Sequence, residues 1–246
     1  MGKRSKKLSS EEQQEVEAWI YQNNTQETRM TDTMTVNVKC KTENQKALVN
    51  SIKVNEVTIC SGPAGSGKTF LACAEALKLI KRYAKYKKIV IVKSVTTLKN
   101  EEIGFLKGGL REKMEPFMFS FVHNFEKIVG QAITSRLREL KTIEEMPIAY
   151  MRGINLDRSI IIVDEAQNVT HDQMEMITTR LGLRSKMMIC GDGFQIDLKK
   201  KADSGFKYLY KASRKVKNLE AITLNSNHRN EIVENLRNYY EDNPIF

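Results

Sequence analysis

Residues 62–69 read Gly62-Pro63-Ala64-Gly65-Ser66-Gly67-Lys68-Thr69 and match the pattern G-x-x-x-x-G-K-[ST] at every fixed position. The stretch follows a β-rich run, residues 57–60, and precedes apolar residues at helical spacing. In such a turn, glycines let successive backbone N–H groups face a phosphate, and the positive end of the next helix points at the same anion. A chance match has a probability of roughly one per cent in a chain of this length. The stretch therefore predicts a nucleotide-phosphate loop.

The residue types in and near this loop suit a nucleotide and its magnesium ion. Lys68 places a positive charge near the β- and γ-phosphates, which makes it a catalytic candidate, and the Thr69 hydroxyl is a ligand for Mg²⁺. Upstream, the Gln45 amide can read an adenine edge with a donor and an acceptor. We expect the nucleotide to contact Gln45 and the following residues: Gly62, Pro63, Ala64, Gly65, Ser66, Gly67, Lys68, Thr69 and Phe70.

Two later apolar runs end in polar residues suited to catalysis. The run 160–163 ends in Asp164 and Glu165, and the run 187–190 is followed by a turn and Gln195. Because the carboxyl ends of parallel strands meet at the edge that carries the phosphate loop, we expect Asp164 to hold Mg²⁺. Glu165 is placed to polarise a water in line with the γ-phosphate. The Gln195 amide can sense that phosphate, although ordinary turn chemistry also explains its neighbourhood.

Short apolar runs alternate with stretches of helical periodicity over most of the chain. Buried strands are expected at 57–60, 89–92, 160–163, 187–190 and 221–224, and helices at 70–80, 117–128 and 173–181. This alternation predicts an α/β fold, with a parallel sheet and helices on both of its faces. We expect one domain over residues 36–246, because no Pro-rich linker divides it.

Residues 1–35 are expected to form an N-terminal arm. Ser9 and Glu12 give a capping signal for a short helix that contains Trp19, the single tryptophan. Where the arm meets the domain, the alternation of apolar residues in the segment 34–38 predicts a half-buried strand.

Composition restricts the class of protein. Lys and Arg number 40 against 30 Asp and Glu, a net charge of +10 that favours polyanionic partners. No purely apolar run exceeds five residues, so we expect no membrane span and no secretory signal. The four cysteines form no C-x-x-C pair, which argues against a zinc knuckle or disulfide scaffold and favours a cytoplasmic protein.

Basic residues recur at helical spacing near the end of the domain. Lys207, Lys211 and Arg214 or Lys215 would form one stripe on a helix, suited to tracking the phosphates of RNA or single-stranded DNA. A solvated helix face explains the same spacing, so the stripe supports a nucleic-acid partner only together with the net charge.

The order of these motifs resembles the PhoH-like family, a single-domain relative of superfamily-one helicase ATPases. The segments that carry the resemblance extend over about residues 42–235. They are 42–48, 62–72, 104–106, 112–113, 116, 148–153, 164–168, 173–174, 179–182, 191–192 and 195–198. The resemblance implies a RecA-like core that binds and hydrolyses ATP, and it also suggests activity on RNA.

The resemblance bears on assembly as well. A helicase motor needs two RecA-like cores and this chain has room for one, so we expect a homo-oligomer, with a ring as one form. Arg229, in Asn227-His228-Arg229, is a candidate arginine finger for a neighbouring subunit's γ-phosphate. Where the family usually has an arginine-proline pair after its second core strand, this chain has Lys93-Ser94.

Other functions stay open at this point. A regulatory ATP-binding switch with a protein partner would use the same loop and leave the basic faces as a solubility surface. A GTPase lacks support because no Asn-Lys-x-Asp motif is present, and a small-molecule kinase fits less well because Glu165 suits water activation. The divergent arm is compatible with a phage protein, whose compartment would be the host cytoplasm.

Overall fold

The computed structural model describes residues 31, 33–94, 110–225, 232, 235–236, 239 and 242–243, with the side chains of the first helical turns at 110–117 left aside. None of its helices is long and apolar enough to cross a membrane. The helices are α2 (Glu43–Val54), α3 (Lys68–Arg82), α4 (Leu110–Val129), α5 (Gln131–Glu139), α6 (His171–Thr178) and α7 (Gly205–Ala212). The strands are β1 (Val57–Ser61), β2 (Lys88–Lys93), β3 (Ile143–Glu145), β4 (Ser159–Asp164), β5 (Lys186–Gly191) and β6 (Leu219–Thr223). Short 3-10 turns are η2 (Ile148–Met151), η3 (Ala166–Asn168) and η4 (Lys201–Asp203).

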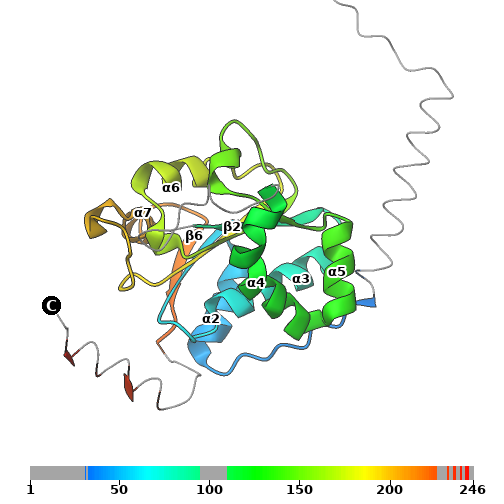
Figure 1. Ribbon diagram of the computed structural model, residues 1–246, viewed down its shortest axis with the longest axis horizontal. Helices are drawn as coiled ribbons and strands as arrows, with labels where there is room; N and C mark the ends of the chain where they lie inside the picture. Colours follow the sequence, from blue (N-terminus) through cyan, green and yellow to red (C-terminus); the bar gives the residue numbers. More distant parts are fainter. Residues whose placement is uncertain are drawn as a thin grey trace, which may run out of the picture.

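Within the described residues, the strands form one parallel sheet in the order β3-β2-β4-β5-β1-β6 (Figure 1). The five expected buried strands lie in this sheet, and the expected helices correspond to α3, α4 and α6. The predicted α/β fold with a parallel sheet is therefore confirmed. In this order β5 separates β1, which leads into the phosphate loop, from β4, which ends at Asp164.

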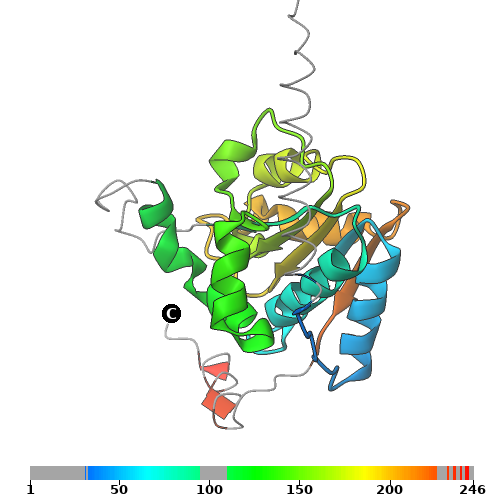
Figure 2. The ribbon, with the colours of Figure 1, turned by 90° about the vertical axis from the view of Figure 1, so that its right-hand side faces the viewer.

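The sheet is covered on both faces, as its continuous apolar strands require. Alternate residues of β4 belong to different clusters: Ile160 and Ile162 pack with α2 to α5, whereas Ile161 and Val163 pack with α6 and α7. Figure 2 shows the blue-to-green helices on one side of the sheet and α6 and α7, yellow-green and orange, on the other. All six residues of β4 are buried. This rigid central strand fixes the position of the acidic residues at its end.

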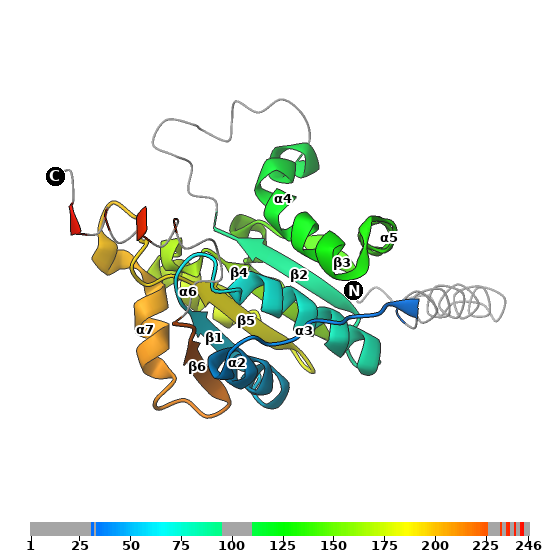
Figure 3. The ribbon, with the colours of Figure 1, turned by 90° about the horizontal axis from the view of Figure 1, so that it is seen from below.

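The predicted strand at 34–38 is wrong. The segment is extended but pairs with no strand among the described residues, and in Figure 3 it runs in blue past α3. Met34 is fully buried in the helical cluster, and its carbonyl oxygen accepts a hydrogen bond from Lys81 Nζ. Val36 and Val38 pack on the same cluster. The period of two thus arises from packing an extended chain on helices, which gives the same alternation as a sheet. The expected helix around Trp19 lies outside the described residues.

Candidate nucleotide-binding and hydrolysis site

Two glycines show why the phosphate loop needs its sequence. A Cβ atom on Gly62 would lie 2.5 Å from the carbonyl oxygen of Leu224, just beyond β6, so only glycine allows this close approach. Gly67 caps the N-terminus of α3 with φ 92° and ψ 13°, a left-handed conformation that other residues rarely adopt. The loop therefore turns sharply between β1 and α3, and the N-terminus of a 15-residue helix points into it.

The loop lysine lies back over the loop itself. Lys68 Nζ donates hydrogen bonds to the carbonyl oxygens of Gly62 at 2.6 Å and Pro63 at 2.9 Å. The ammonium group is thus held at the loop by neutral acceptors. Phosphate oxygens are stronger acceptors for an ammonium donor, because the hydrogen bond is then assisted by charge on both sides.

The two predicted metal ligands lie next to each other. Thr69 Oγ1 donates a hydrogen bond of 2.9 Å to Asp164 Oδ1. Burial raises the pKa of Asp164, the negative charge of the adjacent Glu165 raises it further, and the Thr69 hydrogen bond opposes the shift. Burial destabilises an ionised carboxylate that has no cation beside it. A buried carboxylate next to a hydroxyl is, however, a good place for a hard cation.

Glu165 has an unusual backbone conformation at the end of β4. Its φ of 51° and ψ of 36° lie in the left-handed region, where a residue other than glycine is uncommon and strained. The turn η3 follows at once, and Asn168 N donates to the Glu165 carbonyl oxygen at 2.9 Å. With this backbone conformation, the Glu165 side chain lies at the wall of the same cavity that Asp164 lines.

Gln167 holds this acid, a role that the sequence analysis did not assign. Its Nε2 donates to Glu165 Oε2 at 2.8 Å, and its Oε1 accepts from the backbone N–H of Asp192 at 3.0 Å. Its own carbonyl oxygen accepts from Ser204 Oγ at 2.7 Å. Gln167 thus joins the ends of β4 and β5 and the start of α7. The signal available was its place two residues after Glu165, in the segment that matches the PhoH-like family.

The cavity at this edge of the sheet has a volume of about 700 Å³ and is lined mainly by charged and polar residues. Three acids line it, Asp164, Glu165 and Asp192. Five lysines also line it, namely Lys39, Lys41, Lys68, Lys93 and Lys127. Because lysines outnumber acids, the cavity favours a polyanion such as a triphosphate.

Lys93 owes its place in the cavity to strand register. It is the last residue of β2 and pairs across the ladder with Asp164, the last residue of β4. Its positive charge lowers the pKa of Asp164 against the effect of burial. The sequence analysis noted Lys93-Ser94 only as a departure from the family pattern.

One face of α4 also lines the cavity and was not predicted. It contributes Ser120, His123, Asn124 and Lys127, which are spaced so that they share one side of a helix. The opposite side carries Met118, Phe121 and Phe125, all buried in the core. The polar spacing within the expected helix 117–128 was the signal that could have found these residues.

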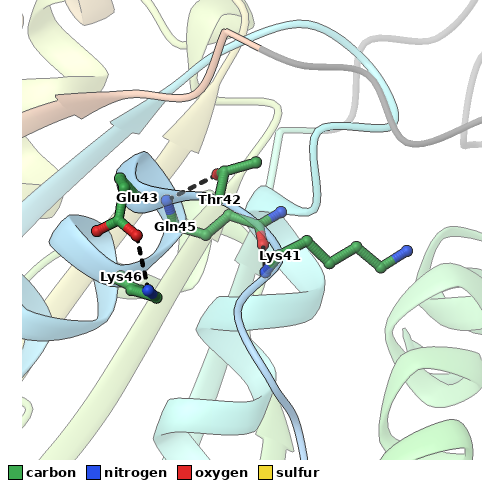
Figure 4. A network of polar contacts seen from close by, with 5 residues as sticks. All are labelled: Lys41, Thr42, Glu43, Gln45 and Lys46. Atoms are coloured by element: carbon green, nitrogen blue, oxygen red, sulfur yellow. Dashed lines mark hydrogen bonds and ion pairs between the residues drawn. The ribbon is translucent and has the colours of Figure 1, made fainter.

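Gln45 lies at the cavity but is engaged with backbone (Figure 4). Its Oε1 accepts from Lys41 N at 2.7 Å, and its Nε2 donates to the Ser66 carbonyl oxygen at 3.0 Å. Thr42 caps α2 by accepting from the Gln45 backbone N–H at 3.2 Å. Gln45 therefore ties the start of α2 to the phosphate loop, and its amide retains one hydrogen and one lone pair for a base edge.

Gln195 stands at the mouth of the cavity, exposed to solvent. Its turn is held by Asp192, whose Oδ1 accepts from Phe194 N at 3.0 Å and whose carbonyl oxygen accepts from Gln195 N at 3.2 Å. This placement is compatible with contact to a terminal phosphate, and the predicted role of Gln195 stays a prediction.

Two groups of predicted residues are absent from the described residues that line this cavity. Arg229 lies outside the described residues. The predicted basic stripe is interrupted, because α7 ends at Ala212 and carries only Lys207 and Lys211. Arg214 and Lys215 follow in a tight turn, in which their N–H groups donate to carbonyl oxygens three residues earlier. The Ser213 hydroxyl, bonded to the Tyr210 carbonyl oxygen, helps to end the helix.

Buried thiols lie behind the phosphate loop. All four cysteines are free. Burial raises the pKa of Cys73 well above its usual range, and the charge of Asp164 adds to this. A hydrogen bond to Cys60, followed by burial, raises the pKa of Cys190 in the same way. Their burial in the core is consistent with a role in packing.

The donor set fits Mg²⁺ and a nucleoside triphosphate. Thr69 and Asp164 would supply the hard oxygen ligands, and the cradle around Gly62 has no room for a side chain. Among the described residues, no three His, Cys, Asp or Glu side chains are grouped to hold a metal ion by themselves. Mg²⁺ at this place would be held by Thr69 and Asp164 together with water and phosphate oxygens.

Comparison with known proteins agrees with this geometry. The family model described as PhoH-like protein matches residues 37–241. The chain belongs to the PhoH-like family. A PhoH-like protein of Bacillus subtilis (strain 168) is 40% identical over 187 residues, which are 76% of this chain and 57% of that protein. Protein PhoH of Escherichia coli (strain K12) is 32% identical over 170 residues, which are 68% of this chain and 48% of that protein.

The family resemblance inferred from the motifs is thus confirmed, and the PhoH-like chain spans about half the length of these curated relatives. Among solved structures, Pif1 helicase from Candida albicans matches 83% of this chain and 44% of its own, with 15% identity and a TM-score of 0.45. The large terminase of a thermophilic bacteriophage matches 82% of this chain and 50% of its own, with 11% identity and a TM-score of 0.47.

Proposed function

We propose that this PhoH-like chain hydrolyses ATP with Mg²⁺ and acts on single-stranded nucleic acid, with RNA as the first substrate to test. The observation that supports it most strongly is the contact between Thr69 Oγ1 and Asp164 Oδ1, 2.9 Å apart, beside a strained Glu165. A hydroxyl, a buried carboxylate and a second acid at a phosphate loop are the parts that phosphoryl transfer to water requires.

Each residue has a distinct task in this reaction. The N–H groups of the phosphate loop and Lys68 would hold the β- and γ-phosphates, and Lys68 would exchange its two carbonyl acceptors for phosphate oxygens. Thr69 and Asp164 would hold Mg²⁺, which supplies neutralisation of phosphate charge. Glu165 accepts a proton from water as the water oxygen bonds to the γ-phosphorus. The bond from that phosphorus to the bridging oxygen breaks, and ADP and phosphate leave.

The nucleic-acid part of the proposal rests on charge. The chain carries a net charge of +10, and lysines 199, 200 and 201 stand exposed before α7, which adds Lys207 and Lys211. Such clusters bind phosphates in a salt-dependent way. If these faces only keep the protein soluble, the same site would instead serve as an ATP-dependent switch for a protein partner.

Turnover with and without single-stranded RNA, at several salt concentrations, tests this proposal. We expect RNA to raise the turnover number and the effect to weaken with salt. Inorganic polyphosphate is the control for charge alone: equal stimulation by polyphosphate and RNA would favour the switch.

Replacing Glu165 tests the chemical step. Glu165→Gln should keep ATP affinity and slow turnover by at least ~10²-fold, because only water activation is lost. Glu175→Gln, an exposed acid on α6, is the matched control and should turn over normally. Normal turnover in Glu165→Gln would contradict the role given to that acid.

We also propose that the chain assembles with copies of itself and that Arg229 completes a neighbour's site. Charge develops on the γ-phosphate in the transition state, and an arginine supplied by a neighbouring subunit would stabilise it. Arg229→Ala should leave ATP affinity nearly intact and lower turnover by roughly 10²-fold.

Mixing two inactive variants makes this test specific. In mixtures of Arg229→Ala with Glu165→Gln, one interface can pair an intact Glu165 with an intact Arg229, so activity should return in part. A monomeric protein with full activity and no recovery on mixing would place Arg229 in its own chain's site.

A further inference from the structure

Two aromatic side chains stand in solvent at the same edge of the sheet as the nucleotide cavity. Phe194, in the turn after β5, is 92% exposed, and Tyr208, on α7, is 68% exposed. Phe194 is the most exposed of the large hydrophobic side chains that the structure describes. Neither ring has a place in the apolar clusters that hold the fold together. Exposure alone does not require a partner, but it leaves the faces of both rings free to contact one.

Basic and aromatic groups surround these rings. The Cε atom of Lys207 lies 3.7 Å from the place of a Cβ on Gly193, so the Lys207 side chain lies along the turn that carries Phe194. The Tyr208 ring meets His171 edge to face, with 5.5 Å between centroids and 75° between planes. Exposed lysines 199, 200 and 201 lie on the segment between the two rings in sequence.

We propose that Phe194 and Tyr208, together with Lys207, form a platform on which the bases of a single-stranded nucleic acid stack. This inference deepens the proposed function and rests on it. A free strand offers unpaired base faces and regularly spaced phosphates, which match separate exposed rings with lysines between them. A protein partner would instead favour a contiguous apolar patch, and here polar residues such as Gln195 flank the Phe194 ring.

A short chain of hydrogen bonds connects the platform to Glu165. Phe194 N donates to Asp192 Oδ1, Asp192 N donates to Gln167 Oε1, and Gln167 Nε2 donates to Glu165 Oε2. On the second side, Ser204, which caps α7, donates to the Gln167 carbonyl oxygen. Gln167 therefore contacts both elements that carry the rings. A strand that shifts either element has a direct route to the position of Glu165.

The test compares a fluorescein-labelled oligo-uridine RNA with an abasic strand of the same length, by anisotropy. The wild-type protein should bind the uridine strand about tenfold or more tightly, because stacking of one base contributes about 1–3 kcal/mol. The double variant Phe194→Ala, Tyr208→Ala should bind both strands equally weakly, and RNA should no longer stimulate its ATPase. Its turnover without RNA should be unchanged.

Tyr83→Ala is the matched control. Tyr83 is also exposed beside basic groups, with the Arg82 guanidinium 5.5 Å and Lys85 Nζ 5.8 Å from its ring centroid, but it lies at the far end of α3. The Tyr83→Ala variant should bind both RNA strands with the affinities of the wild-type protein. Preference for the uridine strand that persists in the double variant, or equal binding of both strands by wild type, would overturn the platform while leaving nucleic-acid binding intact. Failure of wild type to bind either strand would overturn the nucleic-acid function and the platform with it.

Discussion

The buried charges at the two edges of the sheet have different kinds of neighbours. At the carboxyl edge, Asp164 is buried beside Glu165, an acid of the same sign. At the amino edge, Lys186 begins β5 and is also buried, but its Nζ donates to the carbonyl oxygens of Lys53 at 3.1 Å and of Asn55. Burial, and then the charge of Lys85, lowers the pKa of Lys186.

The difference separates a structural charge from a functional one. The carbonyl groups near the C-terminal end of α2 solvate the Lys186 ammonium, so the fold itself provides its partners. The carboxylates at the other edge repel each other, and the chain gives them one hydroxyl from Thr69 and one amide from Gln167. Lys93 offsets part of this repulsion, and a bound cation would offset more of it. Matched substitutions at the two edges test this distinction.

Replacing the two lysines should give the largest contrast. Lys68→Ala should weaken ATP binding about a hundredfold or more, because charge-assisted hydrogen bonds are worth about 1.5–3 kcal/mol each. Lys186→Ala should leave ATP affinity unchanged but lower the free energy of unfolding by about 1–3 kcal/mol, since carbonyl groups lose their donor. Titration with a fluorescent ATP analogue and urea denaturation measure the two effects. Weakened ATP binding in Lys186→Ala would remove the contrast.

Replacing one glycine at each edge should give a smaller contrast. A Cβ on Gly62 would lie 2.5 Å from the Leu224 carbonyl oxygen, and one on Gly182 would lie 2.0 Å from Asp157 Oδ1. Both Gly→Ala variants should lose about 1–3 kcal/mol of stability through overpacking. Only Gly62→Ala should also weaken ATP binding, by about tenfold, since a misplaced phosphate loop loses roughly one hydrogen bond's worth of affinity. Equal ATP affinity in the two folded variants would show that the loop tolerates the shift.

Replacing one aspartate at each edge should give the smallest effects, with opposite signs. The raised pKa of Asp164 means that the folded chain keeps this proton to higher pH than the unfolded chain, so the free energy of unfolding falls as pH rises through that interval. Without Mg²⁺ at neutral pH, Asp164→Asn should therefore be more stable than wild type by about 0.5–2 kcal/mol, and the gain should vanish in acid.

Asp157→Asn is the partner variant. Asp157 Oδ1 accepts from the Leu183 backbone N–H at 2.7 Å, and a neutral amide oxygen accepts more weakly. Its stability should fall slightly at neutral pH. Denaturant midpoints at neutral and acid pH measure the stability of both variants. A loss of stability in Asp164→Asn would contradict the view that burial destabilises this carboxylate.

The sequence was sufficient to predict the sheet and the core of the site. Continuous apolar runs identify strands buried on both faces, and the loop pattern fixes the edge at which Lys68, Thr69, Asp164 and Glu165 meet. These predictions succeed because strand burial and phosphate binding each depend on local residue types.

The rest depends on which distant segments pack together. The alternation at 34–38 predicted a strand, but helices cover that segment. Lys93 enters the cavity because it is in register with Asp164, and Gln167 acquires its role only when β5 and α7 come beside it. Arg214 and Lys215 lie beyond the end of α7, after Ser213, whose hydroxyl donates to the Tyr210 carbonyl oxygen. None of these contacts is encoded in a local pattern.

The position of β1 in the sheet also has a consequence for synthesis of the chain. Its register pairs Val57 with Met187 and with Leu219, partners that lie far along the chain. Contacts of such sequence separation form late, because a long loop must close before the pairing stabilises it. On the ribosome, the phosphate loop would leave the exit tunnel long before the strands on either side of it exist. We therefore expect that a nascent chain can position its phosphate loop only after β6 has emerged.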